Sequence, residues 1–248
     1  MTAAHSRPVA LITGASRRVG AVVARTLHAA GYDLALHYRH SSDEAEALAK
    51  DLEAQRPNST LLLQADLSDL PTLKPLIEKL LAHFGRLDAL INNASAFYAT
   101  PLDSATPMQW NELFASNAQA PFFLTQAAIP ALRKAGGGIV NMLDIYAERP
   151  LAGYTLYCMA KASLAAMTRS LALELGPDIR VNGIAPGAVL WPAEGKSEEE
   201  QNVLLSRTPL KRAGTPEDVA SAILWLLRDA HYTTGQVIHV DGGRILSI

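Results

Sequence analysis

The sequence predicts an α/β protein built on a single-domain, Rossmann-type, doubly wound parallel sheet flanked by helices on both faces. Short apolar runs alternate with helical segments along the chain, which is the pattern of parallel strands joined by right-handed crossovers. A glycine-containing loop, residues 14–20, joins the first such run to the first helical pattern. No linker, repeat or change in composition interrupts the 248 residues, so we expect one domain over 1–248.

Seven strands are expected, at residues 9–13, 33–37, 60–64, 89–91, 138–142, 180–184 and 236–240. Helical patterns occupy the intervals, at residues 21–30, 42–56, 70–84, 107–133, 155–175 and 216–227. Gly31 and Gly176 are typical helix stops, and Ser42 with two acidic residues after it is a typical start. In such sheets ligands bind outside the carboxyl ends of the strands, so the residues after each strand are the candidate site.

Composition limits the functional classes. The chain is 49% hydrophobic and 19% charged, which suits a sizeable core and excludes disorder. Its net charge of −2 offers no basic surplus for a nucleic-acid backbone. Neither a signal peptide nor a membrane span is evident, and the single cysteine suits a reducing compartment, so we expect a cytoplasmic protein. Cys158 could be a reactive thiol, but a small core-filling role is favoured. No metal site is predicted.

Tyr157 and Lys161 stand four residues apart, which places them one turn apart on the same face of a helix. A nearby ammonium favours the phenolate form of a tyrosine and moves it toward acid/base use near neutral pH. Asp144 follows the expected strand 138–142. A strand end that delivers a carboxylate beside this helix would be an acid/base site. For an isolated motif, the alternative is an ordinary amphipathic helix with a solvated lysine.

The first loop and the end of the second strand suit a dinucleotide. Gly14 and Gly20 would let backbone amides approach a pyrophosphate, and Arg17 and Arg18 add cations there, although an ordinary turn is the alternative. The second strand ends without an acidic residue until Asp43, which favours the 2′-phosphate of NADPH over the ribose diol of NAD. A solvated basic turn is the alternative. The residues at that strand end are Tyr38, Arg39, His40 and Ser41.

Further polar residues follow later strands. Asn93 and its neighbours come after the fourth strand, where the ordinary role of such amides is to cap the sheet edge. Phe97 could be a core aromatic, but its loop position allows it to stack on a flat ligand ring. Asn117 is a poor helix former inside a helix and so suggests a polar partner. Pro186-Gly187 is either a turn or a backbone clamp on a nicotinamide amide.

Together these positions resemble the classical short-chain dehydrogenases/reductases over essentially the full length. The motifs in family order are Thr13-Gly14, Asn92-Asn93-Ala94, Asn117, Tyr157-x-x-x-Lys161, Pro186-Gly187 and Asp241-Gly242. The resemblance implies that Tyr157 is the general acid and that Lys161 holds the nicotinamide ribose and lowers the tyrosine pKa. It implies that Asn117 supports Lys161 through water, and that the chain forms a homotetramer.

Two departures from the family pattern are informative. Arg18 stands where the family usually has a middle glycine, and Asp144 stands where it has a serine. With the segments LHYRHSS, RPNS, QADLSD, NNASAFY and GYTLYCMAK, they make the chain similar to a pteridine reductase. That resemblance implies that Arg18 contacts cofactor phosphate and pterin, that Phe97 stacks the pterin against nicotinamide, and that Asp144 helps to protonate pterin nitrogens. The order Arg39-His40 reverses the one expected of that subfamily, and a substrate lid is expected around 188–205.

The resemblance assigns a full set of ligand contacts. The cofactor contacts are Gly14, Arg18, Val19, Gly20, Tyr38, Arg39, His40, Ser41, Asp66, Leu67, Asn93, Ala94, Ser95, Met142, Tyr157, Lys161, Pro186, Gly187 and Val189. The substrate contacts are Arg18, Ser95, Phe97, Asp144 and Tyr157. The implied reaction is hydride transfer from NADPH to dihydropterin or dihydrofolate, with oxidised biopterin or folate as further substrates. Two alternatives stay open: a carbonyl-reducing enzyme such as a 3-oxoacyl thioester reductase, and a non-catalytic NADP-binding regulatory protein.

Overall fold

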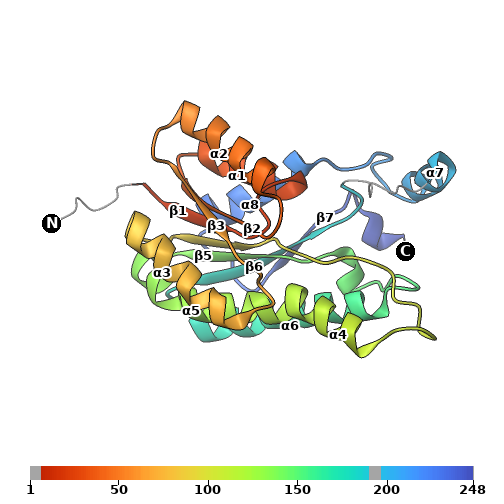
Figure 1. The fold of residues 1–248 in the computed structure, drawn as a ribbon. Helices are drawn as coiled ribbons and strands as arrows, with labels where there is room; N and C mark the ends of the chain where they lie inside the picture. Colours follow the sequence, from red (N-terminus) through yellow and green to blue (C-terminus); the bar gives the residue numbers. More distant parts are fainter. Residues whose placement is uncertain (1–6, 190–196, 248) are drawn as a thin grey trace.

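A computed structural model describes residues 7–189 and 197–247. Its centre is one parallel sheet of seven strands in the order β3-β2-β1-β4-β5-β6-β7. The order reverses between β1 and β4, so the chain winds outward in both directions from that point (Figure 1). The predicted fold class is confirmed. The strands are β1 (Val9–Ile12), β2 (Asp33–Tyr38), β3 (Thr60–Gln64), β4 (Ala89–Asn92), β5 (Gly138–Met142), β6 (Arg180–Pro186) and β7 (Val237–Val240).

Helices cover both faces of this sheet. In Figure 1, α1, α2 and α8 lie on one face, and α3, α5 and α6 lie on the other, with α4 continuing that layer beyond the strand ends. The helices are α1 (Arg18–Ala29), α2 (Ser42–Gln55), α3 (Leu73–Phe84), α4 (Pro107–Phe114), α5 (Ala120–Ala135), α6 (Thr155–Leu175), α7 (Glu198–Ser206) and α8 (Pro216–Arg228).

Burial on both faces explains why the central strands are apolar without alternation. In β1, Ala10 and Ile12 point into the core beneath α1, α2 and α8, whereas Val9 and Leu11 point into the core beneath α3, α5 and α6. All four side chains are fully buried. The rigid sheet therefore fixes the positions at which its carboxyl ends deliver side chains.

Three elements differ from the sequence prediction. The first helix begins at Arg18 rather than residue 21, and Gly20 lies in its first turn. The expected helix 107–133 is divided by a π turn at Ala115–Gln119 between α4 and α5. The segment 193–201 was expected only as a polar stretch, but α7 begins at Glu198, where Ser197 and Glu200 form a reciprocal capping box.

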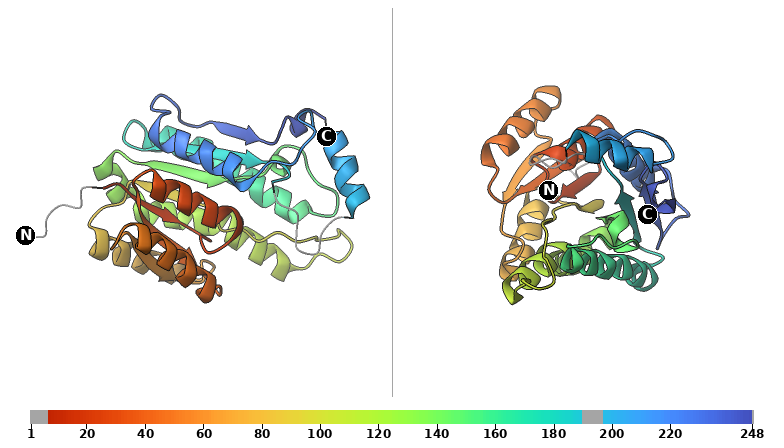
Figure 2. Two further views of the ribbon diagram at one scale, coloured as in Figure 1. Left: turned by 90° about the horizontal axis from the view of Figure 1, so that it is seen from above. Right: turned by 90° about the vertical axis from the view of Figure 1, so that its right-hand side faces the viewer.

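The carboxyl ends of the strands open toward α4, α7 and the last described residues, at the edge of the molecule opposite the start of β1 (Figure 2). Of the expected lid at 188–205, Ala188, Val189 and α7 are described, and residues 190–196 lie outside the described residues. Within 7–189 and 197–247, none of the helices combines the length and apolar character that crossing a bilayer requires.

Candidate active site

The structure brings together the three residues of the expected acid/base group. Asp144 follows β5, and its Oδ1 accepts a hydrogen bond from the Tyr146 amide at 2.9 Å, at the start of a 3₁₀ turn, Ile145–Ala147. Its Oδ2 accepts the Tyr157 hydroxyl proton at an oxygen–oxygen distance of 2.8 Å. Lys161 lies one turn along α6, and its Nζ donates to the Met142 carbonyl at 2.7 Å. The end of β5 is thereby joined to α6 at both Asp144 and Met142.

Burial dominates the electrostatics of this group. Burial and then the Asp144 carboxylate raise the pKa of Tyr157 well above its usual range. Burial lowers the pKa of Lys161 to about 8, although Asp144 acts in the opposite direction. Burial also raises the pKa of Asp144, against hydrogen bonds from Tyr146 and Tyr157 and the charges of Lys161 and Arg244. In the free protein, burial and the Asp144 carboxylate outweigh any lowering of the Tyr157 pKa by Lys161. The expectation that Lys161 favours the phenolate therefore stays a prediction.

An aromatic wall adjoins the phenol of Tyr157. The ring of Phe97 lies 4.8 Å from that of Tyr154 at an interplanar angle of 15°, and 4.7 Å from the Tyr157 ring in an edge-on arrangement. Phe97 is 44% exposed, so its ring is accessible to a ligand. The sequence interpretation missed Tyr154, although an aromatic residue three positions before Tyr157, where α6 begins, was a readable sign.

Asn117 lies in the π turn and is fully buried. Its Oδ1 accepts a hydrogen bond from the Ser95 hydroxyl at 2.6 Å, and its Nδ2 donates to the carbonyls of Ala96 and Leu113 at 3.0 and 2.9 Å. The polar partners expected for Asn117 are thus found. They join the π turn to the loop after β4, and the proposed water-mediated support of Lys161 stays a prediction.

The first loop is bonded to the end of β4. The Thr13 hydroxyl oxygen accepts the backbone amides of Asn93 and Ala94, both at 2.9 Å. The Asn93 side chain donates to the carbonyls of Thr13 and Gly14 at 2.8 and 3.0 Å. A Cβ on Gly20 would lie 2.1 Å from the Gly14 carbonyl oxygen, so the close approach of helix and loop requires glycine there.

His37 in β2 also supports this loop and was missed as a site residue. Its Nδ1 accepts the Gly14 amide proton at 3.2 Å, and its Nε2 bonds to the Ala65 carbonyl at 3.1 Å. Since a carbonyl only accepts, the proton of the neutral ring lies on Nε2. Burial lowers the pKa of His37 to about 4, which keeps the ring neutral at physiological pH. A histidine inside an otherwise apolar strand was the available indication.

The beginning of α1 has the features of an anion site. Arg17 is the N-cap residue of the helix, its backbone is extended, and its side chain makes no capping hydrogen bond. The first amides of the helix are therefore left for a ligand. Arg17 and Arg18 are exposed, and Arg18 adopts φ of 53°, in the left-handed region that suits glycine. A glycine would adopt this backbone without strain.

The end of β2 supplies an arginine that is already paired. Arg39 Nη2 lies 2.7 Å from Asp66 Oδ2, which joins the ends of β2 and β3. Tyr38 and Ser41 are half-buried, His40 is exposed, and Leu67 is buried beside Asp66. No acidic side chain projects from β2 itself at this edge, in agreement with the sequence.

The remaining predicted contacts include the turn after β6. Pro186 ends β6, and the Gly187 amide donates to the Val240 carbonyl at 3.1 Å. A Cβ on Gly187 would lie 2.8 Å from the Cα of Asp241, the residue after β7. The close approach of these two backbones therefore requires glycine at position 187, whether or not a cofactor contacts it. Val19 and Ala94 are half-buried, and Val189 is buried.

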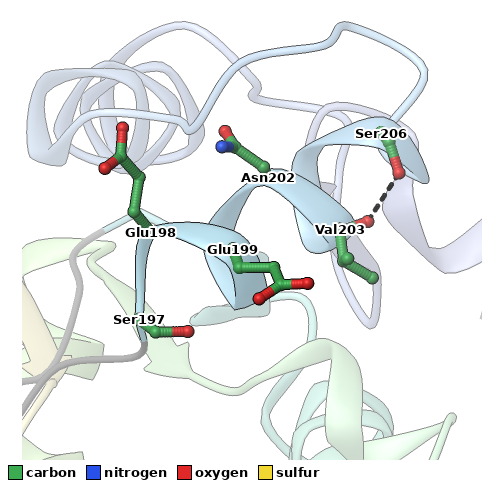
Figure 3. A pocket seen from close by; sticks show the side chains of 6 residues that line it. All are labelled: Ser197, Glu198, Glu199, Asn202, Val203 and Ser206. Carbon is green, nitrogen blue, oxygen red and sulfur yellow. Dashed lines mark hydrogen bonds between the residues drawn. The ribbon is translucent and has the colours of Figure 1, made fainter.

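Away from these residues, a hollow of about 690 Å³ flanks α7. Figure 3 shows that its six lining side chains project from this one helix and its cap. It contains none of the expected catalytic residues, and we assign it no chemistry.

Comparison with known proteins agrees with this geometry. Residues 14–244 match the family model described as Enoyl-(Acyl carrier protein) reductase. Pteridine reductase 1 of Leishmania tarentolae is 37% identical, over 100% of this chain and 99% of its own length. Granaticin polyketide synthase putative ketoacyl reductase 2 of Streptomyces violaceoruber is 39% identical over 98% of both chains. The 3-oxoacyl-[acyl-carrier-protein] reductase FabG of Staphylococcus aureus is 34% identical, over 94% of this chain and 96% of its own. The chain therefore belongs to the short-chain dehydrogenase/reductase family of NAD(P)-dependent oxidoreductases.

Proposed function

We propose that this protein is an NADPH-dependent pteridine reductase, a cytoplasmic homotetramer whose chain is one domain over 1–248. Its substrates are dihydropterin and dihydrofolate, which it reduces to the tetrahydro forms, and oxidised biopterin or folate enter in an earlier step. The full-length similarity to pteridine reductase 1 of Leishmania tarentolae supports this choice.

One observation favours a pterin most strongly: the Asp144 carboxylate bonds to the Tyr157 hydroxyl at 2.8 Å. A carbonyl acceptor becomes an alkoxide and is served by a neutral hydrogen-bond donor such as serine. A C=N acceptor needs a proton on nitrogen, and the pterin ring carries an amino group that a carboxylate can bind. Phe97, exposed beside Tyr157, provides the flat surface on which such a ring stacks.

The residues at the first loop fit NADPH. The Gly14–Gly20 contact leaves room for backbone alone, the start of α1 has free amides, and Arg17 and Arg18 add positive charge. Arg39, His40 and Ser41 would hold the 2′-phosphate, with Arg39 exchanging its contact to Asp66 for the phosphate. When bound, NADPH supplies the hydride.

The protein supplies the proton and the positions of the groups. Tyr157 gives its hydroxyl proton to a pterin nitrogen, which leaves the phenolate. The Asp144 carboxylate then takes up a proton from solvent and passes it to the phenolate oxygen across the 2.8 Å contact, which restores Tyr157 for the next turnover. Lys161 places an ammonium beneath the phenol ring, with Nζ 5.8 Å from the ring centroid, which stabilises the phenolate as the proton leaves. Ser95, whose hydroxyl bonds to Asn117, is the further candidate substrate contact in the loop after β4.

A second candidate is a 3-oxoacyl thioester reductase. The similarity to ketoacyl reductases of Streptomyces violaceoruber and Staphylococcus aureus favours it, at 39% and 34% identity. Asp144 and Arg18 argue against it. A carboxylate at position 144 does not suit a carbonyl acceptor, and an arginine at position 18 does not suit a loop that has glycine there.

The deciding experiment measures NADPH oxidation with dihydrobiopterin, dihydrofolate and an acetoacetyl thioester side by side. Turnover of the pterins alone is expected. Turnover of the thioester alone would overturn the proposal and leave the carbonyl-reducing function. NADPH binding without turnover of any of the three would favour the regulatory alternative.

The Tyr157→Phe variant tests the assignment of the proton donor. Loss of a general acid lowers kcat by about 10²–10⁴-fold, while the phenyl ring keeps its contacts with Phe97. NADPH affinity, measured by quenching of protein fluorescence, should stay close to that of the unmodified protein. A variant that loses NADPH binding together with turnover would contradict the proposed role.

A further inference from the structure

One buried histidine joins the segments that follow β1 and β3. His37 lies in β2 and is only 2% exposed. Its Nδ1 accepts the Gly14 amide proton at 3.2 Å, and its Nε2 lies 3.1 Å from the Ala65 carbonyl oxygen. Backbone bonds run in the same two directions, because the His37 carbonyl accepts the Ala15 amide at 2.9 Å and the Tyr38 carbonyl accepts the Ala65 amide at 3.2 Å. The imidazole is therefore a cross-link between the first loop and the segment after β3.

The ring makes both bonds in only one form. A backbone amide only donates and a carbonyl only accepts, so the proton of the neutral ring must lie on Nε2. The charged ring would carry a second proton on Nδ1, which would face the Gly14 amide. Burial opposes that form and lowers the pKa of His37 to about 4, although Ala65 and Asp66 act in the opposite direction. At neutral pH both bonds are therefore kept.

The two segments that the ring joins carry candidate contacts to different phosphates of the cofactor. The first loop is expected to hold the pyrophosphate. Asp66, next to Ala65, lies 2.7 Å from the guanidinium of Arg39, which is expected to bind the 2′-phosphate. Gly14 is also confined by the loop after β4, since a Cβ there would lie 3.1 Å from the Ala94 Cα. A change at the ring would therefore move one phosphate site relative to the other.

We propose that His37 is a positioning residue of the nucleotide site, which fixes the first loop relative to the segment after β3 before the cofactor binds. The proposal rests on the proposed function only for the choice of NADPH as the ligand. Both ring nitrogens are engaged by protein groups, so His37 acts through Gly14 and Ala65. Preorganisation of this kind raises affinity, because the ligand does not have to order the two segments as it binds.

Three substitutions separate the two bonds. His37→Asn keeps an acceptor near the position of Nδ1 and loses the bond to Ala65. His37→Gln extends far enough to donate to Ala65 but leaves Gly14 without an acceptor, and His37→Leu loses both bonds. The dissociation constants of NADPH and of 2′,5′-ADP, measured by calorimetry, should rise about tenfold in His37→Leu. They should rise less in His37→Asn and in His37→Gln, because each retains one bond.

His28 provides the matched control. It is a second buried histidine, also 2% exposed, and its Nε2 bonds to the hydroxyl of Ser59 at 2.8 Å. It lies near the end of α1 that is remote from the first loop, and Ser59 precedes β3. His28→Leu should lower the free energy of unfolding, because a buried hydrogen bond is lost, but should leave both dissociation constants unchanged.

Unchanged dissociation constants in a folded His37→Leu protein would overturn the inference and leave His37 a structural residue. If His37→Leu does not fold, unchanged constants in His37→Asn and His37→Gln would overturn it equally. A further measurement uses the unmodified protein: the ¹⁵N chemical shifts of the His37 ring should place its proton on Nε2 with and without NADPH, and a proton on Nδ1 would contradict the proposal. Binding of NADH in preference to NADPH would count against the proposed cofactor alone, because the same variants measured with NADH still decide the role of His37.

Discussion

At the scale of single residues, the proposed function depends on the contact between Asp144 and Tyr157. We expect Asp144→Ser to lower kcat/KM for dihydrobiopterin by about 10²–10³-fold, because the proton shuttle is lost. The carboxylate also raises the pKa of Tyr157, so its removal should move the basic limb of the remaining activity to lower pH. Steady-state rates from pH 6 to 10 measure both effects. Asp178→Ser, which removes only a surface pair with Arg133, is the control.

If Asp144→Ser kept full pterin activity, the carboxylate would have no part in the chemistry. If the basic limb of the pH–rate profile of Asp144→Ser moved to higher pH, the result would contradict the expected fall in the pKa of Tyr157. It would mean that Asp144 is protonated throughout the working range of the unmodified protein.

Arg18 offers a second test at this scale, because it holds a left-handed φ of 53°. Arg18→Gly should remove about 1–2 kcal/mol of backbone strain and lose about 0.5–1 kcal/mol to the freedom of the unfolded chain, which leaves a net gain. Arg17→Gly, at φ of −150°, has no strain to relieve and should only destabilise. Urea denaturation compares the two variants. Equal destabilisation of both would show that the backbone of Arg18 is unstrained in solution.

Residues within one short motif could be predicted from the sequence, and residues joined by long-range contacts could not. Tyr157 and Lys161 were readable because helical spacing alone puts them together. The hydrogen bond between Ser95 and Asn117 was not, since it joins the loop after β4 to a π turn that the sequence did not reveal. The net direction of the Tyr157 pKa could not be predicted for a related reason: spacing gives the neighbouring ammonium, but neither the burial of the phenol nor the 2.8 Å contact to the carboxylate.

At the scale of elements, β2 supports the first loop through a single neutral ring. Protonation of His37 would place a proton on Nδ1 against the Gly14 amide. Its pKa is about 4 in the folded chain and near 6.5 when unfolded, so the unfolded state binds the proton more readily as pH falls. The stabilisation is complete above pH 6.5 and is lost as pH falls toward 4, by about 2 kcal/mol between pH 7.5 and 5.

Chemical denaturation at pH 7.5 and 5 measures this loss. His37→Asn should be less stable at pH 7.5 but should show a flatter dependence on pH, because the titrating ring is gone. His231→Asn, at an exposed position, should keep the original slope. An unchanged slope in His37→Asn would mean that His37 does not titrate in the folded chain in this range.

The hydrophobic periodicity of the sequence predicts some helices and strands of this fold better than others. The strands were found within two residues of their ends, because burial on both faces leaves apolar runs that need no alternation. The π turn at Ala115–Gln119 was not found, since one extra residue in a turn leaves the helical pattern on either side intact. The helix α7 was readable from its Ser197 and Glu200 capping box but was passed over for its polar composition.

At the scale of the whole molecule, large apolar side chains remain exposed along α4, α5 and α6. Trp110, Phe122, Phe123 and Met159 are each between 37% and 42% exposed, which is unusual for several large apolar residues of one helical layer in a monomer. We expect light scattering to give four times the 26.6 kDa of one chain. Phe122→Glu should lower this mass, because a carboxylate cannot be buried in an apolar interface at neutral pH.

Lys74→Glu introduces the same side chain on the exposed surface of α3 and is the control. A single-chain mass for the unmodified protein at micromolar concentration would contradict the expected tetramer. A tetramer that survives Phe122→Glu would place the interface elsewhere.

The reversal of strand order between β1 and β4 has a consequence for how such a protein diversifies. The loops after β1 and β2 carry the arginines expected to bind phosphate, and the segments after β4 and β5 carry Phe97 and Asp144. The two groups are joined by the bonds of Asn93 to Thr13 and Gly14. Substitutions at Phe97 or Asp144 that keep these bonds can therefore change the acceptor molecule while the nucleotide site is retained. Relatives named for pteridine and for 3-oxoacyl substrates can therefore stand at similar evolutionary distance from this one chain.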